Sequence, residues 1–281
     1  MKSILLHIND DAALEARTQA ALDLARAFNG HVNCLQSVTY EIFAPGDFYG
    51  SAMAAAMPVI RENAEALRKQ VEDDLANEDV SWSYRFQFGM AESRLLEQSA
   101  INDVVVVGPN DVGEEGPHPS RMVGDLLLYS RTPVLVVPKD HKRLDCAGPA
   151  LVAWNGSTEA CVALRAALPL LAKASKVYLV SVAETKPRQR YDLPPVEGGE
   201  YLSRHGIEAE LVEIPQGDGS IAGNAGRCGP DPALRLYGDG CLWPVAAGGV
   251  PDWRGDAQGA DRSADPDLAR ALSGGGGRVA F

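Results

Sequence analysis

The feature that most constrains the fold of this chain is a pattern that occurs twice in it. A short apolar run, a polar turn, a helix-like segment and a second apolar run follow one another in the first half of the chain and again in the second half. The matched positions are Asn9 and Asn155, Leu22 and Leu168, both pairs 146 positions apart, and Val32 and Val177, 145 positions apart. A repeat this long, with a single register slip, indicates that a whole domain is duplicated.

Apolar runs and helical periodicities alternate along the first copy. Short apolar runs indicate strands, and apolar residues spaced three or four positions apart indicate helices. The predicted strands are 4–8, 32–38, 80–88, 103–108 and 133–138, and the predicted helices are 12–28, 52–76, 91–100 and 121–130, with Pro58 in or near the first turns of the second helix. Because each helix links two strands of one sheet, the strands should be parallel and the sheet doubly wound.

The second copy begins in the same way but is incomplete. Strands are predicted at 150–155, 177–182 and 207–214, with a helix at 196–205. The fold class that follows is α/β, with two tandem doubly wound parallel-sheet domains, the second incomplete. The predicted first domain is 1–140, the linker 141–148, the truncated second domain 149–223 and the irregular tail 224–281.

Charge and hydropathy argue against two classes of partner. The formal net charge of −12 disfavours nucleic-acid binding, because nucleic-acid binders present a basic face. No stretch approaches 18 continuous apolar residues, so we expect no membrane span. We therefore predict a soluble protein that has neither nucleic acid nor a membrane as its partner.

Two segments carry a family resemblance. One is V-A-W-N-G-S-T-E-A at 152–160, and the other is V-V-V-V-G at 104–108 followed by V-G-D-L-L-L-Y-S-R-T-P-V-L-V-V-P at 123–138. Over residues 1–222 the chain resembles the universal stress protein family, as a tandem member. The resemblance implies an adenine nucleotide α-hydrolase-like fold, a cytoplasmic location and a role in the stress response without a catalytic cycle. It also implies that the two copies pair within the chain, with a homodimer as the alternative.

Many members of that family bind ATP through G-x-x-G, nine residues, then G and Ser or Thr, with an Asp at the end of the first strand. Glycines let backbone N–H groups approach the phosphates. The first copy departs from this motif. Asn9 replaces the Asp, Gly108 and Gly124 are 16 positions apart where the motif needs 13, and Asp125 stands where the hydroxyl should be. We therefore expect a packed domain that does not bind ATP in the family's manner.

The second copy offers Asn155, Gly156 and Ser157 after its first strand, and Gly217-Asp218 in a later turn. By resemblance, these five residues are its candidate nucleotide-binding positions. An Asn side chain can accept a hydrogen bond but carries no charge. Asn and Ser are also favoured helix N-caps, so the alternative is that residues 155–157 only begin a helix.

Residues 224–281 have a different composition, with no Lys, no Glu and no Ile. The genetic code suggests a cause, because the tryptophan codon TGG read one nucleotide later always begins with GG and encodes glycine. Trp243 and Trp253 are ten positions apart, as are the last two glycines of the ATP motif. In this frame the codons for 237–254 can encode the motif's glycines in full, although no codon for Arg254 can yield Ser or Thr.

We hypothesise a frame change of one nucleotide near Gly223, caused by a sequencing error or a mutation, with a genuine unrelated tail as the alternative. An early stop codon in the shifted frame of codons 224–281 would exclude the frame change. ATP is then expected as a ligand only for a frame-restored second domain.

The function predicted for this chain is that of a non-catalytic stress-response protein. An adenine-nucleotide-dependent enzyme or ATP-sensing regulator on the same fold is one alternative, and it would need an intact phosphate loop. A partner-binding scaffold is the other. The scattered histidines and cysteines show no spacing that suits a metal site.

Overall fold

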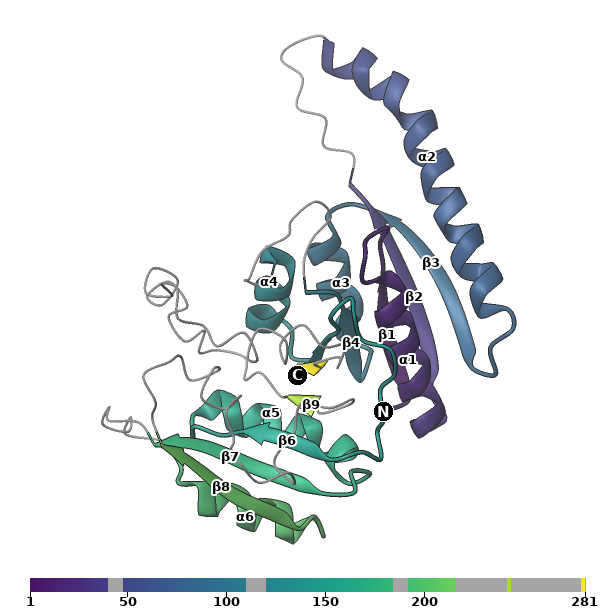
Figure 1. Ribbon diagram of the computed structural model, residues 1–281. Coiled ribbons are helices and arrows are strands. Elements are labelled where there is room, and N and C mark those ends of the chain that lie inside the picture. The colour runs from purple at the N-terminus through teal and green to yellow at the C-terminus, as the bar shows by residue number, and fades with distance from the viewer. Residues whose placement is uncertain (40–47, 110–119, 184–191, 216–241, 244–278, 281) are drawn as a thin grey trace, which may run out of the picture. The chain divides into compact units, whose positions relative to one another are not determined.

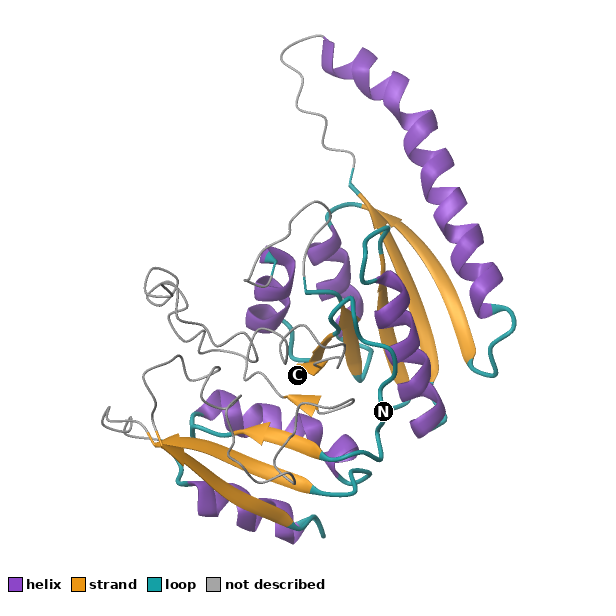
Figure 2. Cartoon of the chain, in the orientation of Figure 1, coloured by secondary structure: helices purple, strands orange, loops and turns teal. Residues whose placement is uncertain are grey.

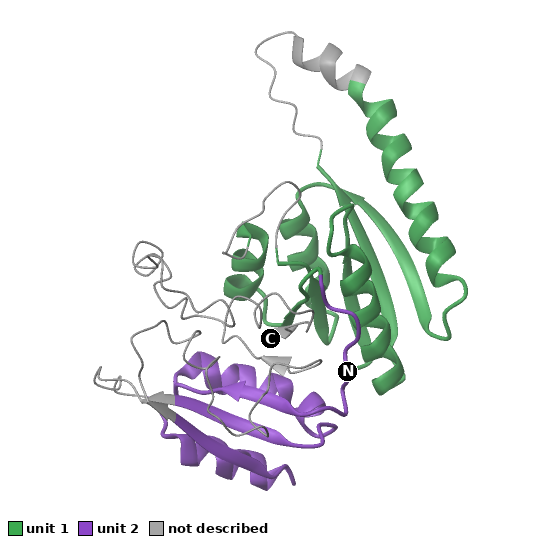
Figure 3. Ribbon diagram, in the orientation of Figure 1, with its two compact units in different colours: residues 1–139 green, residues 140–281 purple. Residues whose placement is uncertain are grey.

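The computed structural model describes residues 1–39, 48–109, 120–183, 192–215, 242–243 and 279–280. The chain divides into two compact units, residues 1–139 and 140–281 (Figure 3). Each unit contains parallel strands joined by helices (Figure 2).

A five-stranded parallel sheet forms the centre of the first unit (Figure 1). Its strands are β1 (Ser3–Ile8), β2 (His31–Val38), β3 (Ser81–Phe88), β4 (Val104–Val107) and β5 (Val134–Val136). They lie in the order β3-β2-β1-β4-β5, and all neighbouring pairs are parallel. Ile4, Leu6 and Val105 are fully buried, as expected for inner strands that are covered on both faces. The predicted doubly wound parallel α/β fold is confirmed.

Four helices link these strands: α1 (Leu14–Phe28), α2 (Phe48–Leu75), α3 (Ala91–Ser99) and α4 (Arg121–Tyr129). Right-handed crossovers place α1 and α2 on one face of the sheet and α3 and α4 on the other. On the second face, Leu5 of β1 packs in one core cluster with Leu95 of α3 and Leu126 of α4. On the first face, the Gln36 amide of β2 donates to the backbone oxygen of Ala64 in α2, at 3.2 Å.

Helix α2 differs from its prediction at its N-terminal end. It begins at Phe48 and not near 52, so Pro58 lies in its interior and not in its first turns. A proline inside a helix removes one backbone hydrogen bond and usually bends or ends the helix. The alanine-rich run 52–56 has a strong intrinsic preference for helix, which accounts for the helix extending N-terminal to Pro58.

The second unit contains β6 (Ala150–Ala153), β7 (Val177–Ala183) and β8 (Ala209–Pro215), with α5 (Thr158–Leu171) and α6 (Pro195–Arg204) between them. The strands are parallel and lie in the order β6-β7-β8. Ala150 is paired with Val177, just as Ile4 is paired with Val32 in the first unit. Positions that match in the sequence repeat therefore occupy matching places in the two sheets. A buried cluster that includes Trp154 joins the strands to both helices.

Two short strands lie in the C-terminal segment, where the sequence pattern predicted none. β9 (Leu242–Trp243) and β10 (Val279–Ala280) pair in parallel. β9 lies beside β6. The rest of the tail that was predicted to be irregular, 224–281, lies outside the described residues.

Candidate functional site

The first candidate site lies at the carboxyl ends of β1 and β4, which are neighbours in the sheet. Asn9 follows β1 and Gly108 follows β4, so the structure brings these two predicted residues to the same edge. Asp11 and Arg17, which the sequence analysis did not single out, contact each other at this edge. Arg17 also contacts the backbone of Asn9.

The guanidinium of Arg17 is the centre of this cluster. The side chain is fully buried, although it comes from the first turn of α1, where charged residues are usually exposed. Its Nε donates to the His7 backbone oxygen at 2.7 Å, its Nη1 to Asp11 Oδ1 at 2.6 Å, and its Nη2 to the Asn9 backbone oxygen at 2.8 Å. The same Asp11 oxygen accepts from the Ala13 N–H at 2.8 Å. Each of the three guanidinium nitrogens therefore has an acceptor.

The packing of this guanidinium explains why position 108 is a glycine. A Cβ placed on Gly108 would lie 3.1 Å from Arg17 Nη1 and 3.2 Å from the Cβ of Ala13. Glycine allows a close approach to the backbone, which phosphate-binding loops exploit. At the end of β4, the group that makes this approach is the chain's own Arg17.

His7 lies in the same cluster, and its pKa is lowered to about 3 by burial and then by the positive charge of Arg17, with Asp11 opposing the shift. In the unfolded chain the ordinary value near 6.5 applies. Below pH 6.5 the unfolded chain binds a proton that the folded chain does not, so stability falls as the pH falls toward 3. The loss is roughly 1.4 kcal/mol per pH unit.

This titration can be measured by comparing the native chain with His7→Gln. Between pH 6.5 and pH 5 we expect the native chain to lose roughly 2 kcal/mol more unfolding free energy than the variant, measured by urea unfolding. The contribution of the surface carboxylates is common to both proteins and cancels in the comparison. Parallel pH profiles would show that His7 is not held neutral by the fold.

The other two residues of the degenerate motif, Gly124 and Asp125, lie inside α4. The Gly124 N–H donates to the Ser120 backbone oxygen at 3.1 Å, and Asp125 is 3.8 Å from the exposed Arg121. Ser120 is the N-cap of α4, and its Oγ accepts from Val123 at 3.3 Å. Gly124 and Asp125 therefore make contacts within a helix and are not part of the Arg17 cluster.

The second candidate site follows β6. Asn155 Oδ1 accepts from the Ser157 N–H at 3.0 Å, and Ser157 Oγ accepts from the Ala160 N–H at 3.2 Å. Ser157 is the N-cap of α5. These are the hydrogen bonds that begin a helix, so the cap role considered for residues 155–157 is present.

Gly156 is held between this cap and the segment before α6. Its φ of +81° is in the left-handed region. The Leu193 N–H donates to the Gly156 backbone oxygen at 2.8 Å, and the Trp154 indole donates to the Leu193 oxygen at 3.2 Å. A Cβ on Gly156 would lie 2.7 Å from the Leu193 nitrogen and closer still to its oxygen. The backbone of Leu193 therefore covers the turn that the resemblance assigns to nucleotide binding.

The remaining predicted residues, Gly217 and Asp218, lie outside the described residues. In the part of the chain that the structure describes, no three His, Cys, Asp or Glu side chains gather as a metal site would require. Among the helices that are described, none is both long and apolar enough to cross a membrane.

Sequence reasoning missed Arg17, although a signal was present. Arg17 stands three positions after Leu14 and four before Ala21, and so lies on the apolar face of α1. A cation on a buried face needs partners, because an unpaired buried charge is strongly unfavourable. Asp11, six positions earlier in the chain, is the nearest acidic residue that precedes the helix.

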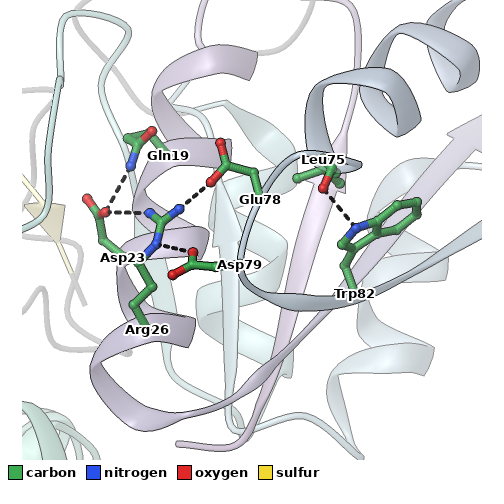
Figure 4. Close-up of polar contacts among 7 residues, drawn as sticks. All are labelled: Gln19, Asp23, Arg26, Leu75, Glu78, Asp79 and Trp82. Carbon is green, nitrogen blue, oxygen red and sulfur yellow. Dashed lines mark hydrogen bonds and ion pairs between the residues drawn. The ribbon is translucent and has the colours of Figure 1, made fainter.

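A second charged cluster lies at the other end of α1 (Figure 4). Arg26 donates to Asp79 at 2.9 Å and to Asp23 at 3.3 Å, and it also bonds to Glu78. The Asp79 side chain is 79% exposed. Ion pairs in such exposed positions contribute little to stability, so this cluster does not resemble the buried Arg17 cluster.

Comparison with known proteins gives a fold and no sequence family. No protein-family model and no curated protein matches this sequence. A universal stress protein from Archaeoglobus fulgidus is similar in structure, with a TM-score of 0.57 and 14% identity, over 99% of this chain and 95% of that chain. A Pseudomonas aeruginosa protein assigned to the universal stress proteins has a TM-score of 0.51 and 14% identity, over 100% and 93% of the two chains. The fold expected from the family resemblance is therefore shown.

Proposed function

We propose that this chain, which has the fold of the universal stress proteins, is a non-catalytic stress-response protein whose first unit is a scaffold that does not bind nucleotide. Parallel α/β sheets bind ligands at the carboxyl ends of their strands. The observation that carries the proposal is that the chain's own groups occupy this edge, namely Arg17 and Asp11 after β1 and Leu193 after β6.

The buried state of His7 supports the non-catalytic part of this proposal. A general acid or base must titrate near the working pH and must reach the substrate. His7, the histidine of the Arg17 cluster, is 3% exposed, and its pKa is lowered to about 3. It therefore remains neutral and enclosed under physiological conditions.

The cellular side of the proposal comes from the family resemblance. We place the protein in the cytoplasm, with its two units paired within one chain. The mass measured by sedimentation over a range of concentrations tests the pairing. A constant monomer mass supports pairing within the chain, and a doubled mass supports a homodimer.

An ATP-sensing regulator or an adenine-nucleotide-dependent enzyme is the second candidate. It is favoured by the turn at Asn155, Gly156 and Ser157, where a left-handed glycine precedes the N-terminus of α5. Helix N-termini and glycine turns suit phosphate groups. In this reading the phosphate loop would be completed only after correction of the proposed frame change near Gly223.

Titration with ATP and magnesium tests the two candidates on two proteins, this chain and the frame-restored chain. We expect no saturable heat signal and no phosphate release from this chain. Saturable binding by the restored chain alone would assign nucleotide binding to the second unit. Saturable binding or ATP turnover by this chain would contradict the proposal.

A partner-binding scaffold is the remaining alternative. It requires that this chain, used as the bait in a pull-down, retain a protein from stressed cells and not from unstressed cells. The complex should contain no nucleotide. Variants of exposed apolar residues in the first unit, such as Ile101→Ser and Tyr129→Ser, should then reduce the retention. The side chains of these two residues project from the fold, with 75% and 70% of their surface exposed.

A further inference from the structure

The first unit contains a site shaped for a planar cation at the carboxyl end of β1. Three acceptors face it, namely the backbone oxygens of His7 and Asn9 and the carboxylate of Asp11. They lie 2.6–2.8 Å from three different nitrogens of the Arg17 guanidinium. The carboxylate supplies the matching negative charge and is only 13% exposed. We call these three acceptors the guanidinium cradle.

The lining of the guanidinium cradle selects among classes of ligand. Its three groups are acceptors without a proton to donate, so they repel phosphate and other anions. An ammonium group is compact and cannot reach acceptors that are spread around a plane, whereas a guanidinium presents donors on every side. Gly108 leaves room for that plane, because a Cβ there would be 3.1 Å from Nη1.

The matching positions of the second unit carry different residues. At the repeat offset of 146, the position of Arg17 is taken by Ala163 and that of Asp11 by Ser157. Ser157 is occupied as the N-cap of α5. The cradle is therefore a property of the first unit that the common fold does not require.

We propose that the guanidinium cradle is a binding site for guanidinium cations that the chain fills with its own Arg17, and that truncation of Arg17 opens it to a free alkylguanidinium. The inference concerns the first unit alone. It holds whether or not the second unit binds nucleotide, so its failure and that of the proposed function are distinguishable.

The test is the thermal unfolding of Arg17→Ala in rising concentrations of methylguanidinium chloride. Guanidinium-type cations destabilise folded proteins in general, so the native chain should melt at lower temperatures throughout. At low concentrations of methylguanidinium the variant should be stabilised. Bound ligand multiplies its folded-to-unfolded ratio by 1 + [L]/Kd, which is about elevenfold when the ligand concentration is ten times Kd. The expected result is therefore a rise in the melting temperature of the variant and a fall in that of the native chain.

Arg26→Ala is the matched control, because it removes from the same helix a guanidinium that is 35% exposed and has one highly exposed partner, Asp79, with 79% exposure. It should melt at lower temperatures, as the native chain does. The double variant Arg17→Ala with Asp11→Asn should lose the stabilisation, and sodium chloride should not reproduce it. An Arg17→Ala response equal to that of Arg26→Ala would overturn the proposal.

If Arg17→Ala does not fold unaided, its yield on refolding tests the same proposal. Its soluble yield should rise severalfold when refolding is carried out with methylguanidinium in place of tetramethylammonium at the same concentration. The native chain should show no such preference. Equal yields of the variant in the two salts would also overturn the proposal.

Discussion

Replacement of Gly156 by alanine is expected to destabilise the second unit by about 3–4 kcal/mol. The left-handed backbone at φ +81° accounts for about 1–2 kcal/mol of this loss. The new Cβ would also displace the backbone of Leu193. That movement breaks the Leu193–Gly156 and Trp154–Leu193 hydrogen bonds, each worth about 1 kcal/mol. Urea unfolding followed by circular dichroism, with hydrogen exchange across 150–183, measures the effect.

Gly206→Ala is the matched control for this change. Gly206 has a φ of +72°, and a Cβ there would have no atom within 4 Å. In the control variant the backbone is strained but the new Cβ contacts nothing. Its free energy of unfolding should therefore fall by only about 1–2 kcal/mol. If the two variants lose the same stability, the close approach of Leu193 is not what requires glycine at 156.

Replacement of Arg17 by methionine is expected to destabilise the first unit by about 3–5 kcal/mol, the range for breaking a buried ion pair from one side. Methionine keeps much of the unbranched stem but removes all three donors. The Asp11 carboxylate and the backbone oxygens of His7 and Asn9 then remain enclosed without these partners. The midpoint of urea unfolding of the full chain, with hydrogen exchange across 3–38, measures the loss.

Arg26→Met provides the comparison on the same helix. Arg26 bonds to three carboxylates, but 35% of its side chain is exposed (Figure 4). Solvent screening limits such pairs to about 1 kcal/mol or less. A loss for Arg26→Met as large as that for Arg17→Met would mean that burial does not determine the strength of these contacts.

Most of the fold of the described residues could be predicted from apolar periodicity. The run Val104–Val107 is buried on every side, and only an inner parallel strand suits such a run. Helix ends were also predictable where a cap was present, as at Ser120 and Ser157. The start of α2 was not, because no cap signal precedes Phe48, and Pro58 suggested a later beginning.

The candidate sites were predicted less well, because their character depends on contacts between distant residues. Gly108 suited a phosphate loop in the sequence, but its neighbour in space is the guanidinium of Arg17. Gly156 also suited a phosphate loop in the sequence, but the backbone of Leu193, which is 37 positions later in the chain, lies against it. Periodicity can place each residue at the correct edge of its sheet, but it does not reveal which distant group fills the space beside it.

The difference of one residue between the two copies has a practical consequence for protein engineering. Matching positions are 146 apart up to Leu22 and Leu168, and 145 apart from Val32 and Val177 onward. The missing residue therefore falls near the end of α5 or in the turn 172–176 that leads into β7. The pairing of Ala150 with Val177 is unaffected by it. This junction is thus a place where the chain has already absorbed a change in length, and short peptide tags or labels inserted at 172–175 should leave both sheets in register.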